Sequence, residues 1–228
     1  MCFRFPASHQ NLAVFFPENV YHVFNRTNHK EPLFLEDKDR LHFLNLYKKY
    51  IAPYVNTFAY CILPNHFHIM FQIKPEDEFQ AVFEHLPQSL LSQPQLYWIM
   101  HPHDPKDIHG VLERQFTRLF TAYAMAFNRK YHRSGNLFYR PFKRVCVKNE
   151  MQMLHLVWYI HHNPQKHGIW KPFSTYKWSS FTALISNQPT MLCRDIVHEM
   201  FNGKEQFLEY HQIPPKEPPE DWDSSMEI

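Results

Sequence analysis

The sequence predicts an α+β fold, in which one antiparallel sheet of four strands carries helices on one face. Two observations lead to this fold class. Runs rich in β-branched and aromatic residues alternate with segments of helical periodicity, and their order is β-α-β-β-α-β followed by another helix. The chain of 228 residues is 44% hydrophobic, which is enough for one sizeable core. Such a split βαβ arrangement leaves the second face of the sheet open, where a site could lie.

The first half of the sheet is the clearest part of this prediction. Residues 20–26 (VYHVFNR) have the composition of a strand, and residues 36–51 have the periodicity of a helix that Pro53 ends. Residues 54–63 and 66–73 form two further strands. Because the turn Pro64-Asn65 separates these two strands, we expect a hairpin.

The second half is interrupted before it continues. We interpret residues 74–110, which contain five prolines, as an insertion with one short helix near 79–85. A long helix over 112–131 and a fourth strand over 142–148 follow. The next helix covers 150–162, and we expect Asn163-Pro164 to end it.

The domain organisation follows from these elements. We expect one domain over residues 1–181, with the insertion at about 74–110, and a C-terminal extension over 182–228. The extension is predicted to hold short helices near 193–201 and 204–210 and to end in an acidic tail (Glu217, Glu220, Asp221, Asp223 and Glu227).

Composition excludes several classes of protein. The high aromatic content of 17%, with only 4 glycines, argues against disorder except at the ends. The longest apolar runs are too short to span a membrane, and no signal peptide is evident. The 4 cysteines form no CxxC pair, so we expect a reducing, cytoplasmic location.

Positive charge is concentrated in one stretch. Between Val111 and Glu150 only two acidic residues oppose nine basic ones, which are Arg114, Arg118, Arg129, Lys130, Arg133, Arg140, Lys143, Arg144 and Lys148. Such a stretch in a chain of net charge +2 indicates a local anionic partner, most commonly nucleic acid. The alternative is a solvated basic helix.

Two histidines lie on one face of the strand at 66–73. Phe67 and its apolar neighbours point toward the core, whereas His66 and His68 point the other way. At positions i and i+2 their rings can converge on one metal ion. The alternative is a pair of ordinary surface histidines.

The helix at 150–162 carries a second polar pair. Tyr159 and Asn163 are four residues apart and therefore share a helix face. A phenol beside a carboxamide could supply a nucleophile and a ligand for Mg²⁺ or Mn²⁺. Alternatively, Tyr159 is a core aromatic residue and Asn163 caps the helix.

Five segments together resemble a known family. They are YHVFNRTNHKEPLF, AYCILPNHFHIMF, NRKYHRSGNLFYRPFKR, YIHHNPQKHGI and YKWSSF, and they occur in the order seen in REP-associated tyrosine transposases. NHFHIMF looks like the histidine motif of HUH endonucleases, to which these transposases are related. The resemblance runs from about Tyr21 to Phe181, outside the insertion, which appears longer than in the family.

The resemblance implies a ferredoxin-like fold and a metal-dependent endonuclease and strand transferase. It implies Tyr159 as the nucleophile that forms a 5′-phosphotyrosine, and a divalent cation, Mg²⁺ or Mn²⁺, bound by His66, His68 and Asn163. The implied partner is single-stranded DNA near hairpins formed by palindromic repeats. Whether the protein acts as a monomer or a homodimer stays open.

The basic residues supply candidates for contacts with DNA phosphates. We expect them to be Arg26, Arg114, Arg118, Arg140, Lys143 and Arg144. Three other functions compete with the transposase: an RNA-binding module of similar fold, a domesticated protein that binds DNA hairpins without cutting, and a metallohydrolase that uses water instead of Tyr159.

Overall fold

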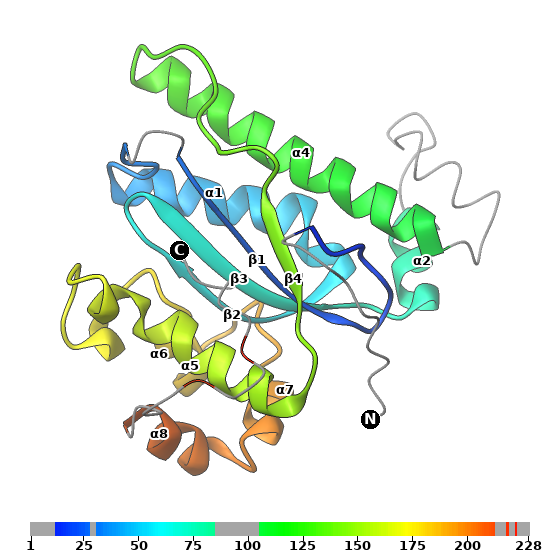
Figure 1. Cartoon of the computed structure of the whole chain (residues 1–228), viewed down its shortest axis with the longest axis vertical. Helices are drawn as coiled ribbons and strands as arrows, with labels where there is room; N and C mark the ends of the chain where they lie inside the picture. Colours follow the sequence, from blue (N-terminus) through cyan, green and yellow to red (C-terminus); the bar gives the residue numbers. More distant parts are fainter. Residues whose placement is uncertain (1–11, 28–30, 85–104, 213–217, 219–221, 223–228) are drawn as a thin grey trace.

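An antiparallel sheet of four strands organises the computed structural model, which describes residues 12–27, 31–84, 105–212, 218 and 222. The strand order is β2-β3-β1-β4, and every neighbouring pair is antiparallel. The strands are β1 (Val20–Arg26), β2 (Val55–Ile62), β3 (His66–Ile73) and β4 (Lys143–Cys146). The predicted α+β class with an antiparallel sheet is therefore confirmed (Figure 1).

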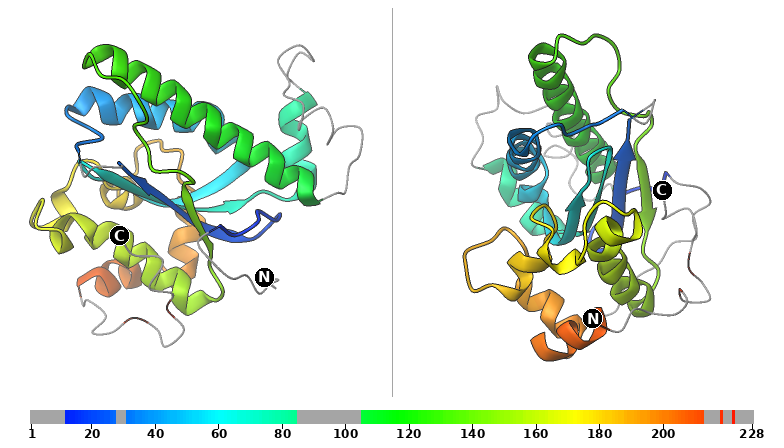
Figure 2. Two further views of the ribbon diagram at one scale, coloured as in Figure 1. Left: turned by 45° about the horizontal axis from the view of Figure 1, so that its top comes forward. Right: turned by 90° about the vertical axis from the view of Figure 1, so that its left-hand side faces the viewer.

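Two helices cover the first face of the sheet. They are α1 (Asp37–Tyr50) and the long α4 (Pro105–Lys130), which pack against each other (Figures 1 and 2). Tyr21 and Val23 of β1 and the odd-numbered residues of β3 point into this core, where they meet apolar residues of α4 such as Phe116. This face is the core that the alternation of β3 predicts.

The second face of the sheet is also covered, which corrects the prediction of an open face. Helix α5 (Glu150–Lys166) packs against β2 and β3 there, and the short helices α6 (Phe181–Ile185), α7 (Arg194–Met200) and α8 (Lys204–Gln212) extend the same layer (Figure 2). Met70 of β3 shares this second core with Leu156 of α5 and Phe207 of α8. The chain therefore builds two apolar cores, one on each side of the sheet.

Helix α5 continues beyond the predicted end. It includes Asn163 and Pro164, and its C-cap is His167, whose amide donates to the Asn163 carbonyl at 3.0 Å. A proline removes one N–H donor, but the amides after it can still bond to earlier carbonyls, so the helix completes its last turn. Asn149 caps the other end by accepting a hydrogen bond of 2.9 Å from the Gln152 amide.

The smaller elements agree in part with the sequence-based expectations. Helix α2 (Glu76–Glu84) lies where a short helix is predicted in the insertion, whereas residues 85–104 of the insertion and the acidic tail lie outside the described residues. The 3₁₀ turns η1 (Ala52–Tyr54) and η3 (Phe173–Thr175) and helix α6 are not predicted. Among the described helices, none has the length and apolar character needed to cross a membrane.

Candidate active site

The two predicted histidine ligands lie beneath helix α5. His66 and His68 are buried, with 3% and 0% of their surface exposed, because α5 covers this face of β3. The prediction that they lie on an open face is therefore wrong, although their side of the strand is the predicted one. Their ring centroids are 5.2 Å apart and the rings are nearly perpendicular, at 87°.

The structure brings the predicted tyrosine to this histidine pair. The Tyr159 ring lies 5.5 Å from the His68 ring, edge-on at 90°. Tyr159 is 2% exposed and belongs to the second core. The ammonium group of Lys166, the exposed last residue of α5, lies 4.8 Å from the centre of the Tyr159 ring. A cation over a ring is attracted to its π electrons, so this contact holds Lys166 beside the tyrosine.

Asn163 forms hydrogen bonds with the Tyr159 backbone and with another histidine, His167. Its side-chain nitrogen donates to the Tyr159 carbonyl at 2.9 Å, and its side-chain oxygen accepts from His167 Nε2 at 3.1 Å. The His167 ring in turn lies 5.0 Å from the His66 ring. Asn163 is fully buried, so its amide oxygen is part of the site and not a solvated cap.

Burial keeps the histidine pair neutral. Burial, with smaller contributions from His167 and Arg26, lowers the pKa of His66 to about 3, and burial lowers the pKa of His68 well below its usual value. Neutral imidazole is the form that binds metal ions.

The hydrogen bonds of His66 and His68 are those expected of two histidines that bind one metal ion. His66 Nδ1 is bonded to Asn65 Oδ1 at 2.7 Å and His68 Nδ1 to His22 Nε2 at 3.0 Å. Among the described residues, His66 Nε2 and His68 Nε2 have no hydrogen-bond partner. Buried polar atoms without partners are rare, and metal binding is one explanation for them. Within the described ranges, no three His, Cys, Asp or Glu side chains are grouped closely enough to bind a metal ion, so a third ligand would be an amide oxygen such as that of Asn163.

Besides Lys166 and His167, the site contains His22 and Trp222, which are also not among the predicted site residues. His22 of β1 is fully buried and stacks against both Phe24 and His68, with ring centroids 4.6 and 5.1 Å away. Trp222 packs against His155 at 4.5 Å and Tyr159 at 5.9 Å. The alternation of β1 alone does not tell which of its residues share a face with His68. That assignment requires the pairing register of β1 and β3, which the sequence does not provide.

An open cavity reaches the edge of the histidine pair. It has a volume of about 570 Å³ and is lined by Arg26, Asn65, His66 and His167, among others. Arg26 is exposed and lies opposite His66 in the register of β1 and β3. The predicted DNA-contacting Arg26 is thus the basic side chain that borders the candidate metal site.

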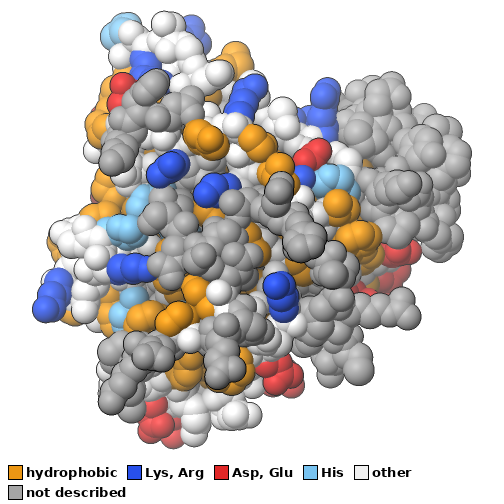
Figure 3. Space-filling view, viewed as in Figure 1, with side chains coloured by type: hydrophobic (Ala, Val, Ile, Leu, Met, Phe, Trp, Pro, Cys, Tyr) orange, Lys and Arg blue, Asp and Glu red, His pale blue; other side chains and the backbone are white. Residues whose placement is uncertain are grey.

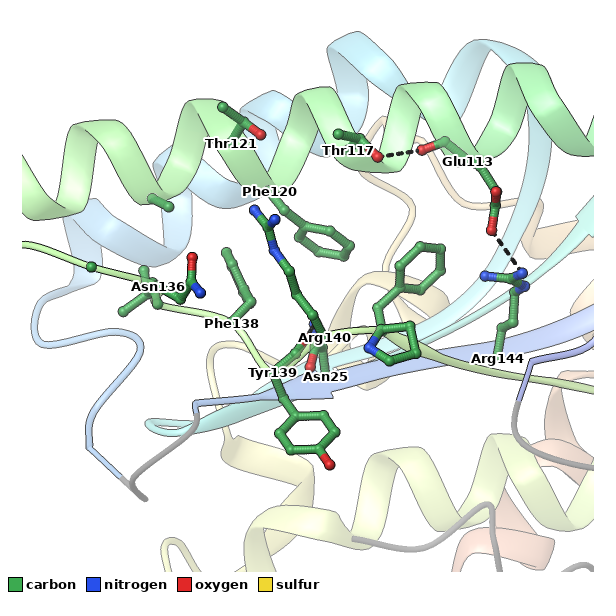
Figure 4. A pocket seen from close by; sticks show the side chains of 15 residues that line it. Asn25, Glu113, Thr117, Phe120, Thr121, Asn136, Phe138, Tyr139, Arg140 and Arg144 are labelled. Atoms are coloured by element: carbon green, nitrogen blue, oxygen red, sulfur yellow. Dashed lines mark hydrogen bonds and ion pairs between the residues drawn. The ribbon is translucent and has the colours of Figure 1, made fainter.

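The predicted DNA-contacting residues around the start of β4 differ in where their side chains lie. Arg140 is exposed and lines a cavity of about 440 Å³ beneath α4, together with aromatic residues such as Phe120 and Phe138 (Figure 4). Lys143 lies on the tyrosine side of the sheet, with its ammonium group 5.6 Å from the centre of the Phe24 ring.

Arg144 points to the opposite face, where it is buried. Its Nη2 atom lies 2.8 Å from Glu113 Oε1 (Figure 4). Its Nε atom donates to the Ala13 carbonyl at 2.6 Å. These contacts give Arg144 a structural role.

Arg114 and Arg118 lie far from the tyrosine in the fold. They line a groove of about 700 Å³ on the α1 and α4 side, together with Lys49 and Tyr50. The sheet separates helices α1 and α4, which carry this groove, from helix α5, which carries Tyr159 (Figure 2). The visible Lys and Arg side chains are spread over the molecule rather than gathered in one patch (Figure 3).

Comparisons with known proteins agree on one family. No family model matches the chain. A Haemophilus influenzae protein that carries the name of a REP-associated tyrosine transposase is 27% identical over 153 residues, which are 59% of this chain and 72% of that protein. A solved structure of a REP-associated tyrosine transposase bound to a REP hairpin matches with a TM-score of 0.52 at 16% identity, over 80% of this chain and 89% of the other. The protein is therefore similar to REP-associated tyrosine transposases in sequence and in fold, which confirms the family resemblance of its motifs.

Proposed function

We propose that the protein is a metal-dependent endonuclease and strand transferase for single-stranded DNA near hairpin-forming repeats, and that it acts through a 5′-phosphotyrosine. The single observation that carries this proposal is the position of Tyr159 beside His68, where the buried Nε2 atoms of His66 and His68 have no hydrogen-bond partner in the described part of the chain. The similarity to REP-associated transposases supports the substrate class, since one of these proteins is bound to a REP hairpin.

The strand order supports the finer assignment of the fold. In the order β2-β3-β1-β4, strand β3 lies between β2 and β1, and β1 lies between β3 and β4. We infer that this is the ferredoxin-like arrangement, with α5 as a tyrosine helix added on the second face.

The ligands of the cation would be His66 Nε2, His68 Nε2 and the Asn163 side-chain oxygen. A mixed set of imidazole and amide ligands suits Mn²⁺ and is compatible with Mg²⁺. When bound, the cation would polarise a nonbridging oxygen of the scissile phosphate. The Asn163 oxygen could bind the cation while it accepts from His167, because an amide oxygen has two lone pairs.

The chain's own residues then account for bond transfer. The Tyr159 oxygen attacks phosphorus, so that an O–P bond to tyrosine forms while the bond from phosphorus to the 3′-oxygen breaks. The phenol proton leaves to solvent, and the departing 3′-oxygen takes up a proton. Lys166, at 4.8 Å from the ring, would stabilise the phenolate, and Arg26 would bind a flanking phosphate. Because the phosphodiester energy is kept in the tyrosine ester, a second 3′-hydroxyl can rejoin the strand.

A covalent-adduct assay tests this proposal. The protein is mixed with labelled single strands from repeats that flank its gene, with Mn²⁺ or Mg²⁺, and the products are separated on denaturing gels. We expect a shifted band that requires metal and disappears in Tyr159→Phe and in His68→Ala. Tyr176→Phe is the control, because Tyr176 is a buried tyrosine of the same core whose hydroxyl donates to the Ile62 carbonyl, and this variant should leave the adduct intact. An adduct that survives Tyr159→Phe would exclude Tyr159 as the nucleophile.

One observation favours the second candidate, a protein that binds hairpins without cutting them. Tyr159 is only 2% exposed, and Trp222 packs against it, so the phenol cannot reach a phosphate unless this cover moves. The two functions differ in one measurement. Hairpin binding in a mobility-shift assay, without any adduct on any strand, would establish the binding protein and overturn the enzyme.

A further inference from the structure

His22 forms a hydrogen bond with a proposed metal ligand. In the antiparallel register, His22 lies opposite Met70, one diagonal step from His68 on the same face of the sheet. The two rings stack at 5.1 Å with an interplanar angle of 18°, and His22 Nε2 lies 3.0 Å from His68 Nδ1. Both residues are fully buried, so water does not compete for this contact.

The contact restricts where protons can reside. A neutral imidazole has one N–H, and a hydrogen bond between two ring nitrogens requires one proton between them. If that proton belongs to His68 Nδ1, the Nε2 lone pair of His68 is free for a metal ion. If it belongs to His22 Nε2, the proton of His68 must reside on its Nε2 atom and blocks the same position.

We propose that His22 is a positioning residue for the metal site: its Nε2 atom accepts a hydrogen bond from His68 Nδ1–H and thereby orients the His68 Nε2 lone pair toward the cation. This inference rests on the proposed function. Metal-binding histidines commonly donate their second N–H to an acceptor that fixes the ring, and losing that acceptor weakens metal binding by about 10- to 100-fold. Here the acceptor is a second imidazole from the neighbouring strand and not a carboxylate or a carbonyl.

His66 and His68 are oriented differently. The Nδ1 atom of His66 is bonded to Asn65 Oδ1 at 2.7 Å, a side chain from the turn before β3, whereas His68 depends on β1. His22 Nδ1 has no hydrogen-bond partner among the described residues, so no third group determines the tautomer of the pair. Metal binding itself would then select the tautomer in which His22 is protonated on Nδ1.

The test measures the affinity for Mn²⁺ itself, in the absence of DNA, by the electron paramagnetic resonance of free Mn²⁺. We expect His22→Phe to weaken binding about 10- to 100-fold. His22→Gln, whose amide oxygen can accept the same hydrogen bond, should remain within about threefold of the wild type. Phe24→Leu is the matched control, because Phe24 also stacks on His68 but offers no acceptor. It should likewise bind Mn²⁺ as the wild type does.

The possible outcomes separate this inference from the proposed function. Wild-type protein that binds no Mn²⁺ would overturn the metal site and the inference with it. Tight binding by both the wild type and His22→Phe would overturn the inference alone, as would an equal loss in His22→Gln and His22→Phe.

A spectroscopic measurement can be made on the wild type, so it does not depend on whether any variant folds. Nitrogen-15 spectra of the histidine rings with Zn²⁺, a diamagnetic probe, should show His22 protonated on Nδ1. Protonation of His22 on Nε2 in the loaded protein would contradict the proposal.

Discussion

His161 Nδ1 donates a hydrogen bond of 2.8 Å to His211 Nε2, and this bond joins the tyrosine helix α5 to the C-terminal helix α8. The direction can be assigned because His211 Nδ1 lies 2.7 Å from the Phe207 carbonyl, which can only accept. The neutral His211 ring therefore has its proton on Nδ1. The second nitrogen of His161 then accepts from Ser180 Oγ at 2.8 Å. The network is complete only while both histidines are neutral.

Acid should therefore destabilise the protein in a defined pH range. Burial lowers the pKa of His211 to about 3 and that of His161 well below its usual value. In the unfolded chain both would be protonated near pH 6.5. The stabilisation is complete above pH 6.5 and is lost as the pH falls toward 3, at a cost of about 1.4 kcal/mol for each histidine at pH 5.5.

Urea unfolding at pH 7.5 and pH 5.5 measures this effect. His211→Leu should unfold more readily at pH 7.5 and should lose less stability between the two pH values than the wild type. The control is His132→Ala, since His132 is exposed and should keep the wild-type slope. Equal pH slopes in the wild type and in His211→Leu would contradict the prediction.

The neighbours Lys143 and Arg144 should respond differently to substitution. Arg144→Met breaks a buried contact with Glu113 and a hydrogen bond to Ala13, so we expect a loss of about 1.5–3 kcal/mol in the free energy of unfolding. Lys143→Met should change stability little but weaken the binding of single-stranded DNA and reduce its salt dependence. Thermal unfolding and fluorescence anisotropy provide the two readouts, and a reversed pattern would refute these assignments.

The groove with Arg114 and Arg118 can be tested by the length of the DNA. Because the sheet separates this groove from Tyr159, a short single strand at the tyrosine should not reach it. We expect the double variant Arg114→Ala/Arg118→Ala to bind a repeat hairpin more weakly, while it forms the covalent adduct on a short strand at the wild-type rate. Equal hairpin affinity would remove both arginines from the DNA interface. Lys38→Ala, an exposed cation of α1, serves as the control.

Trp222 should limit access to the tyrosine. Its ring contacts Tyr159 and also packs with Phe24 and Val145, so it bridges α5 and the sheet. Trp222→Ala should therefore increase the rate at which a small reagent such as tetranitromethane nitrates Tyr159, measured by peptide mass spectrometry. Trp170→Ala is the control, because Trp170 is exposed and bonded to Thr175. An unchanged nitration rate would show that Trp222 does not protect the phenol.

The sequence predicts the strands of the fold because their signals are local. The alternation of β3 shows which side of the strand carries His66 and His68, and the bounds of β1 and β3 agree with the expected ranges. The spacing of Tyr159 and Asn163 correctly predicts that they share a helix face, since the Asn163 side chain donates to the Tyr159 carbonyl.

The remaining features depend on contacts between distant segments. The second core forms because α7 and α8 pack on α5, and short amphipathic segments do not show which surface they cover. His22 and His68 are 46 positions apart in the chain, and their hydrogen bond depends on the pairing register of β1 and β3. Arg144 has the same charge as Arg140, so composition does not distinguish them. Arg144 faces the first core because it lies opposite Val23 in the pairing of β4 with β1.

The two-sided burial of β3 has a consequence for how its pairing is specified. A slip of one residue would exchange every side chain between the two faces. Phe67 and Ile69 would then lie under the tyrosine helix, and the imidazoles of His66 and His68 would enter the apolar core beneath α1 and α4. Uncompensated polar groups in that core would cost about 1–3 kcal/mol each. The same alternation that presents the histidines to Tyr159 therefore also excludes the misaligned sheet.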